Sequence, residues 1–288
     1  MDQNRFLVTM QFNEEDLLPI FLRHYSQYFK PENIYILDHG SSKNLIPSGF
    51  NRIYIPREKK FSEMDRNALV KNICNGLLGY YDYGMYADCD ELINLENVDN
   101  SIFQKSSALY VAGFECTKLK IDGENRLIGL PTPSECKPLI FNKLPSWGLG
   151  FHNCQVENPL EELTIPMIHI RFLDRQIAEK KALQKMQMQS DMLDKEREIG
   201  INDHWSRAKE DVLTFFNHIT YLAGEKKVFD KFSPLKRDEL FEQVVMKKTL
   251  YTAPKFGYVF KGGYIEQSHL YDLTDLFPLM SQNYPELT

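Results

Sequence analysis

The sequence lacks the long apolar run that a membrane-spanning helix needs. Nowhere in the 288 residues do apolar side chains continue for about 18 positions without interruption. Residues 1–5 also lack a basic segment leading into an apolar stretch, so we expect no secretory signal peptide. An excess of basic residues is missing too, since 34 Lys and Arg stand against 40 Asp and Glu. A general nucleic-acid binder is therefore not expected, because neutralising phosphates needs a surplus of cations on one face.

Cysteine is scarce, and its spacing does not indicate a metal site. The five cysteines are odd in number, and no pair has the CxxC spacing of structural zinc sites. We expect free thiols, as in proteins of a reducing cytosol. What the chain has instead is an ordinary globular composition, with 43% hydrophobic and 26% charged residues. Its length suits one large domain, or one domain with an appendage.

Short apolar segments and amphipathic helices alternate through the first hundred residues. A buried parallel strand is expected at 6–10, and further strands are expected at 34–37, 52–55 and 84–87. Helices are expected from Asn13, whose side chain would cap the first turn, and from Glu63 to about Tyr81. This order predicts an α/β fold of the doubly wound type, with a mixed sheet flanked by helices.

The remainder of the chain divides into two parts of different character. Residues 101–172 are rich in Gly, Pro and β-forming residues, and strands are expected at 109–114, 119–121, 127–130 and 139–141. Residues 173–288 are expected to form a mainly helical C-terminal extension, with helices at 174–199, 208–222 and 235–248. The first of these helices is polar on nearly every side, so we expect it on the surface, as a lid or a partner-facing element.

Polar side chains follow the expected strands at the points where they end. Asn13 follows the first strand, Asp38 the second, and the sequence Asp88-Cys89-Asp90-Glu91 the fourth. In a doubly wound sheet, ligands bind beyond the carboxyl ends of the strands. We therefore expect these side chains to meet at one edge of the sheet.

The sequence Asp88-x-Asp90-Glu91 is the motif with the clearest chemistry. Two carboxylates one residue apart at the end of a strand suit a hard divalent cation such as Mg²⁺ or Mn²⁺, which leaves coordination positions for phosphate oxygens. Such an ion would neutralise a nucleotide's diphosphate and stabilise it as a leaving group. The alternative is structural, because an acidic pair after a strand also caps the following turn.

Two further residues suit a nucleotide, each with a structural alternative. Asp38 could accept hydrogen bonds from a base or from ribose hydroxyls, or bond within its own Gly- and Ser-rich turn. Arg66, on the second expected helix, has a planar donor fork that fits a phosphate or a base. A solvated arginine on a helix face is the competing interpretation.

Histidines and charged residues in the second part of the chain are the remaining candidates. A neutral imidazole of His152 or His169 would add a metal ligand, although a lone histidine is more often structural. Lys137 and Arg171 flank these histidines and could hold phosphate charge. A hydroxyl acceptor must lose a proton as it attacks, and the candidate general bases are Glu157 and Glu115.

Three segments together resemble the family 2-type glycosyltransferases, namely residues 8–15, 34–42 and 86–92. The resemblance is to the group in which an Asn-Glu pair precedes an apolar helix and the metal motif reads DxDE, and it covers roughly residues 5–175. It implies a GT-A fold, in which a nucleotide-binding half (1–100) joins an acceptor and metal half (101–172). It also implies transfer of a sugar from a nucleotide-sugar donor to a hydroxyl, with Mn²⁺ or Mg²⁺. The resemblance favours inversion, but the sequence has no clear acidic pair that marks the base of inverting members, so inversion and retention both stay open.

The resemblance also implies roles for individual residues. Asp90 matches the direct metal ligand, and Asp88 the residue nearer to the ribose or to a metal-bound water. His152 resembles a histidine that lies near the metal and the diphosphate, with His169 as its rival. One departure is Lys43, which stands near the place where the family has a second acid. The nucleotide-sugar site would be lined by Thr9, Asn13, Asp38, Arg66, Asp88 and Lys137.

The partners implied are a nucleotide-sugar donor and a saccharide or glycolipid acceptor. The resemblance points to surface-polysaccharide or lipopolysaccharide assembly on the cytoplasmic side of a membrane. Basic residues of the C-terminal extension could make peripheral contact with anionic lipid, or could form solvated faces. These are Lys180, Lys181, Lys185, Lys236 and Arg237.

Other functions fit the same α/β pattern less well. A phosphohydrolase with Asp38 as nucleophile needs two acids in the loop that follows the strand, and this loop has one. A nucleotidyltransferase needs a glycine- and base-rich loop after the first strand, where this chain has the acidic, glycine-free segment 11–15. The third alternative is a non-catalytic nucleotide-binding scaffold. A metal-dependent response to nucleotides would separate it from the transferase.

Overall fold

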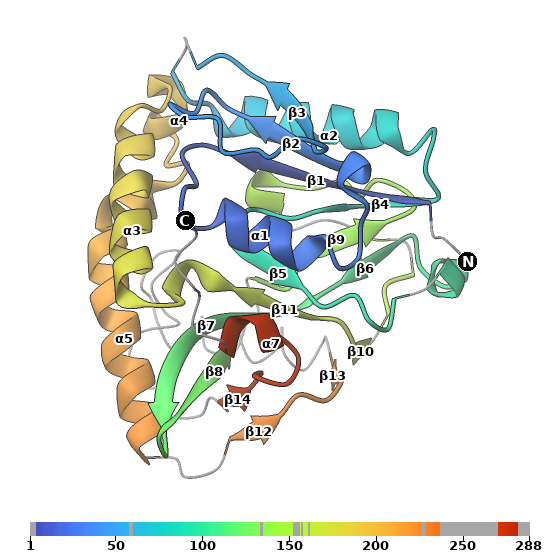
Figure 1. Ribbon diagram of the computed structural model, residues 1–288. Helices are drawn as coiled ribbons and strands as arrows, with labels where there is room; N and C mark the ends of the chain where they lie inside the picture. Colours follow the sequence, from blue (N-terminus) through green and yellow to red (C-terminus); the bar gives the residue numbers. More distant parts are fainter. Residues whose placement is uncertain are drawn as a thin grey trace.

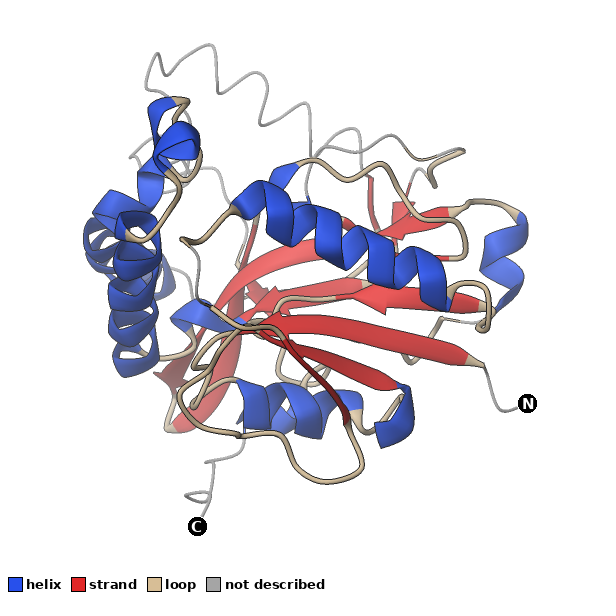
Figure 2. Ribbon diagram, turned by 90° about the horizontal axis from the view of Figure 1, so that it is seen from above, coloured by secondary structure: helices blue, strands red, loops and turns tan. Residues whose placement is uncertain are grey.

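The computed structural model is a mixed α/β protein with two six-stranded mixed sheets and several helices (Figure 1). The residues that the structure describes are 4–57, 60–98, 100–132, 135–151, 156, 158–160, 162–225, 229–236 and 270–281. Viewed from above, helices lie on both faces of the strands (Figure 2). The α/β class expected from the sequence is therefore confirmed.

The first sheet contains the four parallel strands expected in residues 1–100, followed at one side by β9, which is antiparallel to its neighbours, and then β6. The central strands are buried and apolar, as in β1, where Phe6, Leu7 and Val8 are fully buried, whereas the edge strand β3 is largely exposed. In spatial order the strands are β3 (Asn51–Tyr54), β2 (Ile34–Asp38), β1 (Arg5–Gln11), β4 (Tyr83–Tyr86), β9 (Pro138–Phe141) and β6 (Ala108–Tyr110).

Two helices connect the parallel strands. Helix α1 (Leu18–Tyr25) leads from β1 to β2, and α2 (Glu63–Leu77) leads from β3 to β4. Since β2 and β4 lie on opposite sides of β1, right-handed crossovers place these helices on opposite faces of the sheet. The expected cap at Asn13 is wrong. The N-cap residue is Leu17, whereas Asn13 adopts a left-handed conformation (φ 52°) and bonds to the next loop.

The second sheet is built around the long hairpin of β7 and β8, which turns at Asp122 and Gly123, both with positive φ. Residues 109–114, expected as one strand, divide between β6 and β7, which belong to different sheets. In spatial order the strands are β12 (Asp230–Lys231), β14 (Tyr271–Asp272), β8 (Glu124–Pro131), β7 (Ala112–Ile121), β11 (Pro166–His169) and β5 (Glu91–Ile93). A separate pair joins β10 (Glu162–Leu163) to β13 (Leu235–Lys236).

The segment after 172 returns to the second sheet. Helices α3 (Arg175–Ser190) and α5 (Ala208–Glu225) lie side by side (Figure 1) and pack on β8, with the rings of Phe172 and Phe215 stacked 4.3 Å apart. The helix expected at 174–199 is broken at 191–193, and α4 (Asp194–Glu198) follows. Of the helix expected at 235–248, residues 235–236 are strand β13 and the rest lies outside the described residues.

The remaining helical elements are short. They are η1 (Pro31–Asn33), η2 (Asn100–Gln104), η4 (Leu149–Phe151), η5 (Ile170–Phe172), η6 (Asp203–Arg207) and α7 (Pro278–Ser281). In the part of the chain that the structure covers, no helix combines the length and apolarity that crossing a bilayer requires. The thiols of Cys74, Cys89, Cys116 and Cys136 are buried and free, and Cys154 lies outside the described residues.

His24 on α1 provides a pH-sensitive contribution to stability. Its imidazole is buried and bonds to the backbone oxygen of Ile93 at 2.8 Å. Burial lowers the pKa of His24 to about 4, so the unfolded chain binds a proton more readily than the folded chain. The stabilisation is therefore complete above the unfolded pKa of about 6.5 and is lost as the pH falls towards 4.

We expect His24→Gln to flatten the acid side of the stability profile. Glutamine can still donate to Ile93 but does not gain a proton, so on the order of 3 kcal/mol of the wild-type loss between pH 7 and pH 4 should disappear. Urea unfolding at several pH values measures this difference. The matched control is Asn217→Gln on α5, an exposed residue that does not titrate, so this variant should keep the wild-type profile. Parallel profiles for wild type and His24→Gln would contradict the assignment.

Candidate functional site

The turn after β4 carries the DxDE motif and is closed by two reciprocal hydrogen bonds. The amide of Glu91 donates to the backbone oxygen of Asp88 at 2.9 Å, and the amide of Asp88 donates to Glu91 Oε2 at 3.0 Å. The turn then leads into β5, so the chain passes here from the first sheet to the second. It lies at the carboxyl end of β4, beside β1, where the strand order of the parallel sheet reverses direction.

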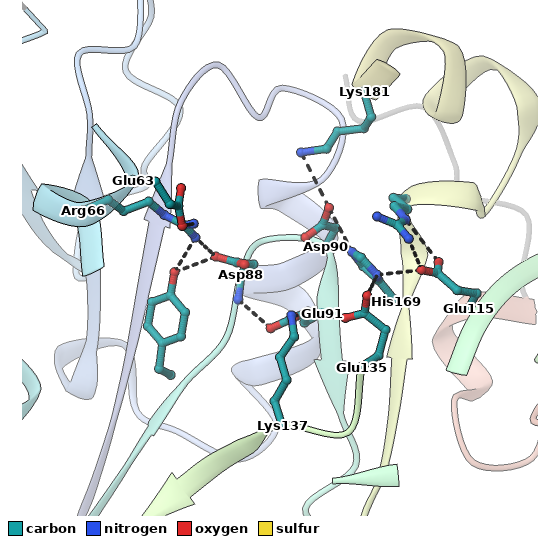
Figure 3. Close-up of polar contacts among 12 residues, drawn as sticks. Glu63, Arg66, Asp88, Asp90, Glu91, Glu115, Glu135, Lys137, His169 and Lys181 are labelled. Atoms are coloured by element: carbon teal, nitrogen blue, oxygen red, sulfur yellow. Dashed lines mark hydrogen bonds and ion pairs between the residues drawn. The ribbon is translucent and has the colours of Figure 1, made fainter. Parts of the chain in front are cut away.

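Asp88 is held by Arg66 from the first turn of α2. The Arg66 guanidinium forms an ion pair with Asp88 and a second one with Glu63 at 2.9 Å, while the Tyr86 hydroxyl donates to Asp88 at 2.5 Å (Figure 3). Burial disfavours the Asp88 charge, but Arg66 and Lys137 outweigh it and lower the pKa of Asp88. Among the described residues, every hydrogen bond to this carboxylate falls on Oδ1.

The N-terminus of α2, which positions Arg66, is fixed by two caps. Ser62 accepts from the Asp65 amide at 3.0 Å, as N-cap residues do. The fully buried carboxylate of Glu196 on α4 accepts from the Glu63 amide at 2.9 Å and from the Ser62 hydroxyl at 2.6 Å. The C-terminal segment therefore helps to aim Arg66 at Asp88.

Asp90 faces cations from two other elements. His169 Nε2 lies 3.3 Å and Lys181 Nζ 3.7 Å from Asp90 Oδ2, and the Ile170 amide donates to the backbone oxygen of Asp90 at 2.7 Å. Burial opposes the Asp90 charge, but Lys181 and His169 hold the pKa of this carboxyl well below its usual value. The closest contacts of both cations fall on Oδ2, and no hydrogen bond from the described residues falls on Oδ1.

The register of the second sheet explains how His169 reaches the motif. In the sheet, Glu91 on β5, His169 on β11 and Glu115 on β7 stand opposite one another in one row. Residues in such a row point to the same face, so their side chains meet. His169 Nδ1 lies 3.2 Å from Glu115, whose carboxylate also accepts from Arg171. Despite burial, Glu115 and Asp90 raise the pKa of His169 to about 9, so both ring nitrogens donate.

Lys137 lies in the buried interior of this network. It pairs with Glu91 and with Glu135, the latter at 3.1 Å, and its side chain is only 5% exposed. The backbone of Glu135 passes directly over Gly113 of β7, where an added Cβ would lie 2.4 Å from the Glu135 oxygen. Glycine at 113 is what allows Glu135 and Lys137 to approach this row.

One group of described residues has the spacing of a metal site, with ligand atoms of Glu115, Glu135 and His169 within 4.8 Å of one another. Each member, however, already has a charged partner. Arg171 pairs with Glu115, Lys137 pairs with Glu135, and His169 carries its own positive charge. A cation placed here would meet two fixed positive charges and an imidazolium without a lone pair, so the ion pairs explain this cluster better than a metal does.

Helix α3 closes the other side of the motif. Lys181 forms an ion pair with Glu14 at 2.6 Å, and the exposed Lys180 pairs with Asp16 at 2.8 Å. Burial raises the pKa of Glu14, and Lys181 partly offsets this effect. These contacts fix α3 to the loop after β1, and Lys181 forms part of the site rather than of a lipid-facing or solvated surface.

The remaining residues predicted for the nucleotide site lie on β1, at the end of β2 and in the loop after β1. Asn13 Oδ1 accepts from the Ser42 amide at 2.9 Å, which ties the two loops together. Asp38 is fully buried and bonded to Arg52 (2.6 Å) and Gln11 (2.7 Å). Thr9 is fully buried on β1. Asp38 is thus buried and already paired. Asp88, Asp90 and Arg66 instead form the group of charged residues around the turn after β4.

Sequence reasoning missed Glu14, Glu135 and Lys181 as site residues. The signal for Lys181 was its spacing, because Ala178, Lys181, Ala182 and Lys185 stand at i, i+3, i+4 and i+7, the pattern of one helix face. His152 and Glu157 lie outside the described residues, so their predicted roles stay predictions.

No protein-family model matches the sequence, and no curated protein is significantly similar to it.

The site that results is a rim of charged groups at the junction of the two sheets. Two ionised carboxylates, Asp88 and Asp90, each keep one oxygen that accepts no hydrogen bond from the described residues. Cations on either side come from α2 (Arg66) and α3 (Lys181). Such a rim can hold a hard cation together with a polyanionic ligand.

Proposed function

We propose that this protein is a divalent-metal-dependent glycosyltransferase, which moves a sugar from a nucleotide-sugar donor to a hydroxyl of a saccharide or glycolipid acceptor. The observation that carries the proposal is the pair Asp88 and Asp90, ionised and partly open at the point where the parallel sheet reverses its strand order. Doubly wound sheets bind nucleotides at this point. The resemblance of the DxDE and Asn-Glu segments to family 2-type enzymes supports the same function.

The strand order supports a GT-A type of architecture. The sequence β3-β2-β1-β4 is that of a nucleotide-binding α/β half, with crossover helices on both faces. Residues 101–172 would then supply the acceptor side, through β7, β8 and β11. The motif lies where the two parts meet, which is where a donor and an acceptor have to be brought together.

The residues present fit a divalent metal. Asp88 and Asp90 offer hard oxygen donors whose pKa values are lowered, and a divalent ion would share these carboxylates with the cations that pair with them, Arg66 at Asp88 and His169 with Lys181 at Asp90. These two carboxylates would hold Mn²⁺ or Mg²⁺, and the ion, when bound, acts as a Lewis acid on the diphosphate. His169 is not needed as a ligand, because as an imidazolium it orients Asp90 instead.

The chain's own residues would then position and balance the reaction. The bond between the anomeric carbon and the phosphate oxygen breaks, and its electron pair stays on the nucleoside diphosphate. The acceptor oxygen forms the new bond and gives its proton to a base. Glu115 is fully buried between His169 and Arg171, which suits a positioning residue. The role of Glu157 as the base, and action at the cytoplasmic face of a membrane, remain predictions.

The test is a thermal melt with uridine or guanosine diphosphate, with and without Mn²⁺, followed by incubation with a panel of nucleotide-sugars. A diphosphate at about 100 times its Kd should raise the melting temperature by on the order of 5 °C, and only with the metal present. Slow release of free sugar should identify the donor. No shift with any nucleotide would favour a scaffold, and release of inorganic phosphate would favour a phosphohydrolase.

A further inference from the structure

The inward face of α3 carries lysines where a packed helix carries apolar residues. Ala178 and Ala182 on this face are buried, with 1% and 3% of their surfaces exposed. Lys181 and Lys185 occupy the positions between and after them, one helical turn apart. Both lysines are half-buried, and withdrawing an ammonium from water is costly unless a partner compensates for it.

Lys181 and Lys185 differ in their partners. Lys181 pairs with Glu14 at 2.6 Å and reaches Asp90 at 3.7 Å. Lys185 lies within electrostatic range of Asp90 and Glu115 and of two cations, Arg171 and Lys181. Within the described residues, however, Lys185 has no hydrogen bond and no carboxylate within 4.0 Å.

The cations around Lys185 have partners, whereas Lys185 itself has none among the described residues. Arg171 forms an ion pair with Glu115, and Lys181 forms one with Glu14. The charges of Lys185 and Arg171 also influence the pKa of Asp211 on α5, but Asp211 forms an ion pair with neither of them. Burial, and next to it Arg171, lower the pKa of Lys185 to about 8, as expected of a cation that lacks a close anion.

The position of this corner relative to the motif indicates what it binds. Lys185 stands one helical turn beyond Lys181, whose Nζ lies 3.7 Å from Oδ2 of Asp90, the carboxylate proposed to hold the metal. A diphosphate bound to that metal carries more negative charge than one divalent ion neutralises. A lysine ammonium beside it would make charge-assisted hydrogen bonds to the phosphate oxygens.

We propose that Lys185, flanked by Lys181 and Arg171, is a phosphate-binding residue that holds the diphosphate of the donor at the rim formed by Asp88 and Asp90. This inference rests on the proposed function and adds a residue to it. Helix α3 is then a part of the donor site. By neutralising the diphosphate, Lys185 would stabilise it as it leaves the sugar.

The experiment uses inorganic pyrophosphate as the probe, titrated calorimetrically into the full-length protein with and without Mg²⁺. Lys185→Gln should weaken pyrophosphate binding by about 10- to 100-fold, the effect of one charge-assisted hydrogen bond. Lys185→Arg, which keeps the charge, should restore most of it. The matched control is Lys180→Gln, the exposed neighbour on the opposite side of α3, which should bind as wild type does.

Two results would overturn the inference. These are unchanged pyrophosphate binding in Lys185→Gln, and no pyrophosphate binding by the wild-type protein. Melting curves should show that Lys185→Gln is folded, because the residue has no bond to lose.

Failure of the inference can be told apart from failure of the proposed function. If pyrophosphate binding depends on Lys185 but no nucleotide-sugar is turned over, the anion site stands and the transferase proposal falls. If sugar transfer proceeds and Lys185→Gln leaves the KM of the donor and pyrophosphate binding unchanged, the transferase stands and the anion site falls.

Discussion

Asp90→Asn is expected to lower donor turnover by roughly 10²- to 10³-fold, which is the effect of removing one charged group that stabilises the leaving group. The mechanism is loss of a charged ligand, because asparagine keeps the shape of the side chain and one oxygen but not the negative charge. Mn²⁺ affinity, measured from the electron paramagnetic resonance of the free ion, should fall with it. Asparagine is preferred to alanine because Asp90 is only 7% exposed and contacts His169 and Lys181.

Asp82→Asn is the matched control for this variant. Asp82 is exposed and lies just before the amino end of β4, at the opposite end of the same strand. The two substitutions are chemically identical, so they separate the effect of the carboxyl-end rim from a general effect on the strand. Full turnover and unchanged Mn²⁺ affinity in Asp90→Asn would show that Asp90 is not the ligand.

Lys137→Met is expected to reduce the free energy of unfolding by about 3–5 kcal/mol, as when one partner of a buried ion pair is removed. The lysine is 5% exposed, and its partners Glu91 and Glu135 are 1% and 8% exposed. Burial already raises the pKa of Glu91, with Lys137 as the main influence that opposes it. Without the lysine, both acids must either stay charged in the interior or take up protons.

Urea unfolding at pH 7 measures the loss, and two further variants define its cause. Glu91→Gln combined with Lys137→Met should recover part of the stability, because it removes one of the two stranded charges. Lys105→Met, at an exposed lysine, should change the stability by less than about 0.5 kcal/mol. A loss below about 1 kcal/mol in Lys137→Met would mean that the network does not hold the two sheets together at this point.

Much of the first sheet follows from local pattern. The strands expected at 6–10, 34–37 and 84–87 lie within one residue of β1, β2 and β4. Buried parallel strands are continuous apolar runs, which a sequence displays directly. The expectation that polar residues gather at the carboxyl ends of these strands is met by Asp88 and Asp90. The pattern also placed Asp38 correctly at the end of β2. It did not show that Arg52 forms an ion pair with the Asp38 carboxylate.

The rest of the site depends on distant pairings that no local pattern contains. Glu115 and His169 are 54 residues apart, and they meet only because β7 and β11 pair in one particular register. A shift of β11 by one residue would turn the side chain of His169 to the opposite face, away from Glu115. The inward face of α3 was not predicted as part of the site for another reason. Its lysines read as solvent-exposed until their partners, Glu14 and Asp90, are known.

In the structure, the three acidic residues of the DxDE motif have different contacts. Glu91 accepts from the Asp88 amide and pairs with Lys137, so it shapes the turn and does not face a ligand. Asp88 and Asp90 face cations from different elements, Arg66 in the first case and His169 with Lys181 in the second. The acidic residue after the DxD pair is thus a structural part of the motif.

The most direct test of the central claim is a crystal structure of the protein grown with Mn²⁺ and the nucleoside diphosphate that raises its melting temperature most. The account predicts an anomalous manganese peak bound by Asp88 and Asp90, with the diphosphate on the ion at the carboxyl ends of β1 and β4. An anomalous peak elsewhere, or a diphosphate bound away from these two carboxylates, would contradict it.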